Sequence, residues 1–200
     1  MRWDRFFEDL EDQLDSEWEA ERAALDTEAE RLRLSRVPLR DRLVVLGERP
    51  GVRVSMGLAD GVELFGAISR VGADWVALRV EDGPTPVLWI VPLAAIDVLA
   101  VTADEVLSSV RGAHPGGALG QRMSLGFVLR DLVRRRVPLT VALLSGRSLS
   151  GTVDRAGADH LDIALHEIGA VRRVDQVHGF RLIPFAAVAA IRVDAVVELA

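Results

Sequence analysis

The sequence predicts a mainly β protein, in which two tandem, small, five-stranded barrels follow a long N-terminal α-helix. Three observations predict this fold: an acidic N-terminal segment without Pro or Gly, a block of sequence that occurs twice, and apolar residues that alternate within each block. The predicted boundaries are 1–36 for the helix, 39–101 and 124–193 for the barrels, 102–123 for a linker and 194–200 for a C-terminal tail.

The N-terminal segment is typical of an amphipathic helix with one apolar stripe. Twelve acidic and three basic residues give positions 1–30 a net charge of −9, so the remaining chain carries +3 of the total of −6. Near-heptad spacing predicts that the stripe pairs with another helix, as in a coiled coil, or docks on its own domain. Its candidate self-association or partner-binding residues are Trp3, Phe7, Leu10, Leu14 and Trp18.

The repeated block carries the same residues at the same spacing in both copies. Val52–Val80 aligns without a gap on Val137–Leu165 at an offset of 85 residues, and Ile90–Leu99 aligns on Leu182–Ile191 at an offset of 92. Two collinear matches predict an internal duplication, with seven additional residues in the middle loop of the second copy.

Each copy is predicted to contain a short helix followed by five short strands. Leu39–Leu46 and Leu125–Arg135 have the helical pattern, and apolar residues at alternate positions predict the strands. Glycine in mid-strand indicates a bend, and Gly-Ala-Asp predicts a tight turn. These structural positions are Gly66, Gly72 and Asp74 in the first copy and Gly151, Gly157 and Asp159 in the second.

A short helix, glycines between alternating apolar residues and a Pro-led last strand together resemble the Sm-like and SH3-like small barrels. The resemblance covers residues 39–101 and 124–193. It implies a five-stranded barrel that joins others through edge strands and, in many members, binds RNA. The chain departs from the RNA-binding members because it has no Asn, and because Trp89–Pro92 and Arg181–Pro184 stand where those members have an Arg-Gly pair.

No catalytic motif is found, so we expect a protein that is not an enzyme and that uses no cofactor. The chain has no Cys, which excludes disulfides, thiolate nucleophiles and zinc sites built on Cys. His160, Asp162 and His166 would share one strand face, but exposed histidines of this kind more often have no metal to bind. No metal site is therefore predicted.

Arginines cluster around the second copy. The candidate residues for contact with nucleic acid or with an acidic partner are Arg130, Arg134, Arg135, Arg136, Arg172 and Arg173. Converging guanidinium groups could bind phosphates in bidentate fashion. They could equally bind the acidic N-terminal helix of the same or a sister chain, or be a solvated surface.

Neither a signal peptide nor an uninterrupted apolar stretch of membrane-spanning length is evident, so the cytoplasm is the expected location. Together these observations predict a non-enzymatic interaction or scaffold protein, which acts through its barrels and its acidic helix. Its expected partner is another protein or a second copy of itself, and no small-molecule substrate is indicated. The alternative is a regulator that binds RNA or DNA through the arginines of the second copy.

Overall fold

The computed structural model describes residues 18, 22, 27–81, 83, 85–113, 119–167 and 177–193. The chain divides into two units, Met1–Pro38 and Leu39–Ala200. In the first unit, residues 27–35 are helical, and Arg33 forms an ion pair with Glu30 at 2.7 Å. Most of the helix predicted for residues 1–36 lies outside the described residues.

The described residues of the second unit form ten strands, and every pairing between them is antiparallel. The predicted mainly β class is therefore confirmed. Alternating buried and exposed residues make β1 and β2 typical half-buried strands. The strands are β1 (Val54–Leu58), β2 (Glu63–Val71), β3 (Trp75–Val80), β4 (Val87–Pro92), β5 (Ile96–Ala100), β6 (Pro138–Leu143), β7 (Ser148–Ala156), β8 (His160–Leu165), β9 (Phe180–Pro184) and β10 (Val188–Val193).

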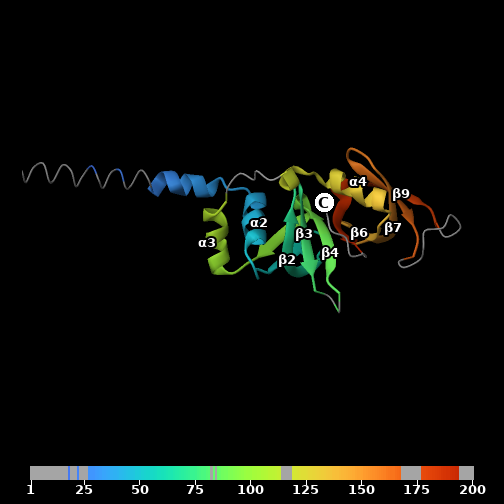
Figure 1. The fold of residues 1–200 in the computed structure, drawn as a ribbon, viewed down its shortest axis with the longest axis horizontal. Coiled ribbons are helices and arrows are strands. Elements are labelled where there is room, and N and C mark those ends of the chain that lie inside the picture. Colours follow the sequence, from blue (N-terminus) through green and yellow to red (C-terminus); the bar gives the residue numbers. More distant parts are fainter. Residues whose placement is uncertain are drawn as a thin grey trace, which may run out of the picture. The chain divides into compact units, whose positions relative to one another are not determined.

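All ten strands belong to one sheet, in the order β5-β1-β2-β3-β4-β10-β6-β7-β8-β9. The first five form one half and the last five the other, and the two halves run in the same strand order. The predicted pair of five-stranded barrels is not evident in this pairing, because β4 pairs with β10 and joins the halves. Figure 1 shows strands of both halves within this one unit.

Helices accompany each half of the sheet. α2 (Leu39–Glu48) precedes β1 and packs on β2, and α4 (Leu125–Arg135) precedes β6 and packs on β7. The segment predicted as a linker, 102–123, also contains regular structure: α3 (Ala103–Arg111), which packs on α2, and the 3₁₀ helix η2 (Leu119–Arg122). Further 3₁₀ turns, η1 (Leu93–Ala95) and η4 (Phe185–Ala187), connect the last two strands of each half.

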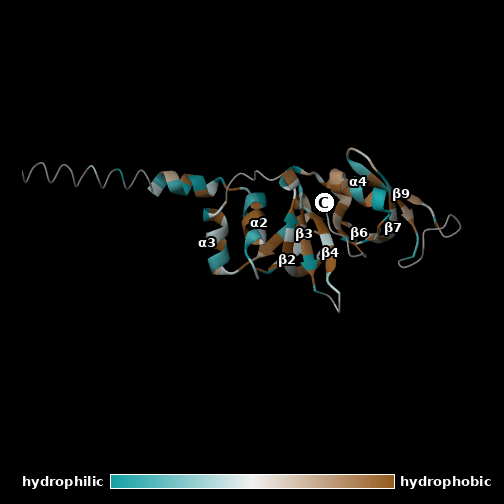
Figure 2. Cartoon of the chain, in the orientation of Figure 1, coloured by the Kyte–Doolittle hydropathy of each residue, from teal (hydrophilic) through white to brown (hydrophobic). Residues whose placement is uncertain are grey.

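The hydrophobic core has two clusters, one in each half, and each includes residues of the other half. Trp75, Ala77 and Ile90 of the first half belong to the second half's cluster, which also contains Leu129 and Leu139. In return, Ala190 of the second half belongs to the first cluster. Figure 2 shows hydrophobic residues on the strands and on parts of the helices that pack against them. The two halves therefore stabilise one another.

Gly66 and Gly151, predicted as bends, lie in mid-strand where two backbones come very close. A Cβ at Gly66 would collide with the carbonyl of Arg79 on β3, and one at Gly151 would collide with that of Ala164 on β8. Close approach between paired strands is thus the physical reason for glycine at both positions.

Candidate interaction edges of the sheet

The contact between the two halves begins at the turn that joins β2 to β3. The indole N–H of buried Trp75 donates a hydrogen bond to the carbonyl of Met123 at 2.9 Å, and the amide of Ala73 donates to the same carbonyl at 2.9 Å. The Asp74 carboxylate accepts a hydrogen bond from the amide of Leu125, the first residue of α4, at 2.7 Å. A carboxylate at this position satisfies a free helical N–H and interacts favourably with the helix dipole.

We expect Asp74→Ala to lower the free energy of unfolding by about 0.5–2 kcal/mol, because α4 loses its N-terminal acceptor. Urea denaturation at low protein concentration measures the change. The matched control is Asp159→Ala, since Asp159 occupies the same turn position in the second half but its side chain is 90 % exposed. Equal losses in both variants would contradict the capping role of Asp74.

The second part of the contact is the pairing of β4 with β10. Ile90 lies opposite Ile191, Trp89 opposite Arg192 and Leu88 opposite Val193. Ile90 and Ile191 are both completely buried. This pairing gives both strands a neighbour on each side, so their backbone groups and apolar side chains are shielded from water.

β5 and β9 stand at the two ends of the strand order, and each pairs with one neighbour among the described residues. Their apolar side chains are correspondingly exposed: Leu182 by 70 % and Phe180 by 54 % on β9, and Val98 by 57 % on β5. An end strand that exposes large apolar side chains offers a template to which another strand can add. We call β5 and β9 the open edges.

Beside the β9 edge lies the turn that contains Asp159. His160 Nδ1 donates a hydrogen bond to the Asp159 carboxylate at 2.8 Å. That hydrogen bond and the nearby charge of His160 lower the pKa of the Asp159 carboxyl below its usual value, although desolvation opposes them. The carboxylate is therefore ionised and exposed next to an open edge. Gly157 leaves space for the His160 ring, just as Gly72 does for Trp75.

His160 and Asp162 stay close together, with His160 Nε2 3.8 Å from the Asp162 carboxylate, but His166 has other partners. His166 is buried and its Nε2 lies 2.8 Å from the hydroxyl of buried Thr152, while its Nδ1 donates to the carbonyl of Glu167 at 2.9 Å. Both ring nitrogens are thus engaged in the interior, whereas His160 is at the surface. In the part of the chain that the structure describes, no three His, Asp or Glu residues gather as a metal site.

Of the five candidate residues of the predicted stripe, only Trp18 is described. Its backbone is helical, and the residue is 67 % exposed. The other four stripe residues, Trp3, Phe7, Leu10 and Leu14, lie outside the described residues. A helical Trp this exposed is available to a partner surface.

The predicted arginines are only partly brought together. Arg130, Arg134 and Arg135 lie on α4, and Arg136 ends that helix in a left-handed conformation with φ of 52°. Arg135 is paired with Asp131 at 2.8 Å. Arg134 and Arg136 line a polar hollow of about 410 Å³, with Thr152 and Asp154 of β7 on its other side. Arg172 and Arg173 lie outside the described residues.

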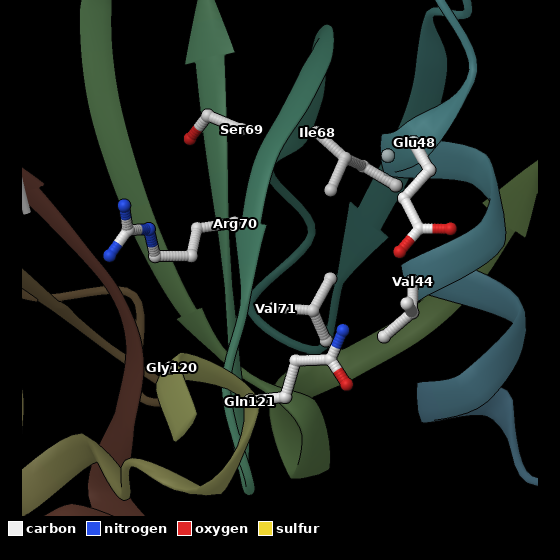
Figure 3. Close-up of a pocket in the computed structure, with 9 residues that line it drawn as sticks. Val44, Glu48, Ile68, Ser69, Arg70, Val71, Gly120 and Gln121 are labelled. Carbon is white, nitrogen blue, oxygen red and sulfur yellow. The ribbon is translucent and has the colours of Figure 1, made fainter. Parts of the chain in front are cut away.

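A second, more apolar hollow of about 360 Å³ lies between α2, β2 and η2. Figure 3 shows Val44 and Glu48 of α2 facing Ile68 and Val71 of β2, while Arg70 extends away from the helix. The lining combines three aliphatic side chains and two glycines with four polar or charged residues: Glu48, Ser69, Arg70 and Gln121.

Sequence reasoning missed α3, whose start carries a recognisable signal. Thr102 and Glu105 form a capping box: the Glu105 amide donates to the Thr102 hydroxyl, and the Thr102 amide donates to the Glu105 carboxylate at 2.7 Å. Thr-x-x-Glu before an apolar residue predicts a helix start. The contact of Asp74 with Leu125 has no comparable signal, because it joins residues that are distant in sequence.

Comparison with protein-family models, curated proteins and solved structures finds no match to this chain. In the part of the chain that the structure describes, no helix combines the length and the apolar character needed to cross a membrane. The candidate site is the pair of open edges, and it is defined by strand order and side-chain exposure.

Proposed function

We propose that this chain is a non-enzymatic interaction or scaffold protein, which binds extended protein segments by strand addition at its open edges. One observation carries the proposal: both end strands of the sheet expose apolar side chains beside a row of backbone groups that another strand could pair with. In this mode of recognition, main-chain hydrogen bonds supply affinity, and alternate side chains supply specificity.

Internal duplication supports this proposal. At the offsets of 85 and 92 residues, the strand registers of the two halves coincide: Gly66 pairs with Val80 as Gly151 pairs with Leu165, and Trp75 with Pro92 as His160 with Pro184. We infer that the halves are two copies of one small, barrel-like unit of the Sm-like or SH3-like kind. Such a unit binds its neighbour through β4 and β10 within this chain.

The acidic N-terminal helix is proposed as a second interaction element. Residues 1–30 carry a net charge of −9 and an apolar stripe whose candidate contact residues run from Trp3 to Trp18. A helix with one apolar stripe and a strongly charged remainder is suited to pairing with another helix or with a basic partner surface.

Strand addition is tested with a fluorescent peptide of residues 187–193, the sequence that pairs with β4 inside the chain. β9 is the strand of the second half that is equivalent to β4 in the first, so we expect the peptide to pair with β9. Binding to the full-length protein should raise the fluorescence anisotropy of the peptide to a plateau. A peptide with alternate amides N-methylated is the control. Equal binding of both peptides, or of neither, would contradict strand addition.

The alternative function, binding of RNA or DNA, is favoured by the polar hollow that Arg134 and Arg136 both line. Both side chains could contact one phosphate group there. Asp154 on the opposite wall and the negative end of α4 oppose an anion at this position, which is why strand addition remains the first proposal.

For nucleic-acid binding, we expect Arg134→Glu to weaken association with a 20-nucleotide RNA or DNA at least tenfold at low salt, because it removes one phosphate contact and adds a repulsive charge. Filter binding over a salt series measures it, and a lost contact also reduces the salt dependence. Arg147→Glu, at the exposed β6–β7 turn, is the control of equal charge change. Absence of binding, or equal effects of both variants, would exclude this function.

A further inference from the structure

Equivalent positions in the two halves differ sharply in exposure, and the difference falls at the open edges. Ile90 on β4 is fully buried, whereas Leu182, its equivalent on β9 at the offset of 92 residues, is 70 % exposed. Ala190 on β10 is fully buried, whereas its equivalent Val98 on β5 is 57 % exposed. The internal contact is the pairing of β4 with β10. Leu182 is the equivalent of a β4 residue and Val98 the equivalent of a β10 residue, so β9 and β5 resemble the two strands of that pairing.

The first residues of α4 and α2 also differ in exposure. Leu125, at the start of α4, is 3 % exposed and donates its amide to Asp74. Leu39, at the start of α2, is 41 % exposed, and the carboxylate of Asp159 is open to solvent. Asp159 stands beside the β9 edge, while α2 belongs to the half that contains β5.

We propose that β9 of one molecule pairs antiparallel with β5 of a second copy, so that the sheet continues from chain to chain in the register of the β4–β10 pairing. This inference rests on the proposed function and names the occupant of its open edges. The register places Leu182 opposite Leu99 and Phe180 opposite Val101. The Asp159 carboxylate then accepts a hydrogen bond from the amide of Leu39 in the second copy.

Charge at the two edges fits this pairing. Arg181 is exposed on β9, whereas Asp97 is exposed on β5. Asp104 and Glu105, at the start of α3, are already engaged by Arg49 at 3.5 Å and by the Thr102 amide at 2.7 Å. Positive and negative groups at the two edges favour the pairing of unlike edges over the pairing of two like ones. α3 follows β5 directly, yet it packs on α2 and leaves Val98 exposed.

Pairing of unlike edges is a head-to-tail contact, which produces a closed ring or an open filament. His160 and Asp162 stand where Trp75 and Ala77 stand in the first half, so the face beside β9 is more polar than the internal contact. The association is accordingly weaker than the internal contact, and the size of the assembly grows with protein concentration.

Edge variants of the full-length protein test the proposal by light scattering. Wild type is expected to exceed the 21.8 kDa of one chain several-fold at high concentration. Leu182→Asp and Val98→Asp each remove one edge, and each is expected to be a monomer. Leu144→Asp, at an exposed position of the β6–β7 turn, should assemble as wild type does. Circular dichroism verifies that all variants retain the wild-type spectrum.

The decisive sample is an equimolar mixture of the two edge variants. Leu182→Asp retains β5 and Val98→Asp retains β9, so head-to-tail pairing predicts a dimer of twice 21.8 kDa that stops there. A mixture that stays monomeric, or a Val98→Asp variant that assembles alone, overturns the proposal. If wild type is monomeric but the peptide of residues 187–193 binds, self-assembly fails while the proposed function stands; if neither occurs, both fail.

Discussion

Gly151→Ala is expected to destabilise the protein by about 3 kcal/mol or more, which would be among the largest effects of any single methyl group in this chain. The added Cβ collides with the Ala164 carbonyl on the paired strand β8. The Cβ is bonded directly to the Cα, and the carbonyl oxygen is a backbone atom, so no side-chain rotation relieves the clash. Strands β7 and β8 must move apart, which weakens their hydrogen bonds.

Chemical denaturation followed by circular dichroism measures the loss of stability. Gly120→Ala is the control, because the added methyl there meets only the flexible end of Met123 at 3.7 Å. The control should change the free energy of unfolding by less than about 1 kcal/mol. If Gly151→Ala were as stable as the control, the close approach of β7 and β8 would be wrong.

Trp75→Ala is expected to cost about 3–5 kcal/mol, the range for removing a large aromatic side chain from a core. Trp75 is fully buried in the second half's hydrophobic cluster although it belongs to β3 of the first half. Its loss therefore leaves a cavity between the halves and removes the hydrogen bond to Met123. The two halves should then unfold with less mutual cooperativity.

Hydrogen exchange localises this effect. Amides of β6 and β8 should lose protection together with those of β3, although they lie in the other half of the sequence. Trp75→Phe keeps most of the volume but has no indole N–H, so it should cost less and isolate the hydrogen bond to Met123. Loss of protection restricted to the first half would show that the halves do not share a core.

Local patterns in the sequence were sufficient for the mainly β class and for the positions of its turns. Alternating apolar residues such as Val54, Met56 and Leu58 have a period that only strands satisfy, and all three are buried. Gly66 and Gly151 were recognised as special positions, although the structure adds the close backbone approach as the reason.

The joining of the two halves could not be predicted in the same way. Whether β4 ends a barrel or pairs with β10 depends on contacts between residues about one hundred positions apart, and apolar alternation is the same in both cases. The open edges could not be predicted for the same reason. Leu182 and Ile90 have similar sequence contexts, and only the pairing of β4 with β10 makes Ile90 buried while Leu182 is exposed.

The most direct test of this account is the native mass of the full-length protein over a range of concentrations, measured beside a chain that begins at Arg36. If the open edges bind second copies, both proteins exceed the mass of one chain, which is 21.8 kDa at full length, and both masses rise with concentration. Assembly that is lost with residues 1–35 would assign it to the N-terminal helix instead. A full-length protein that remains at 21.8 kDa at every concentration would contradict self-assembly through the edges.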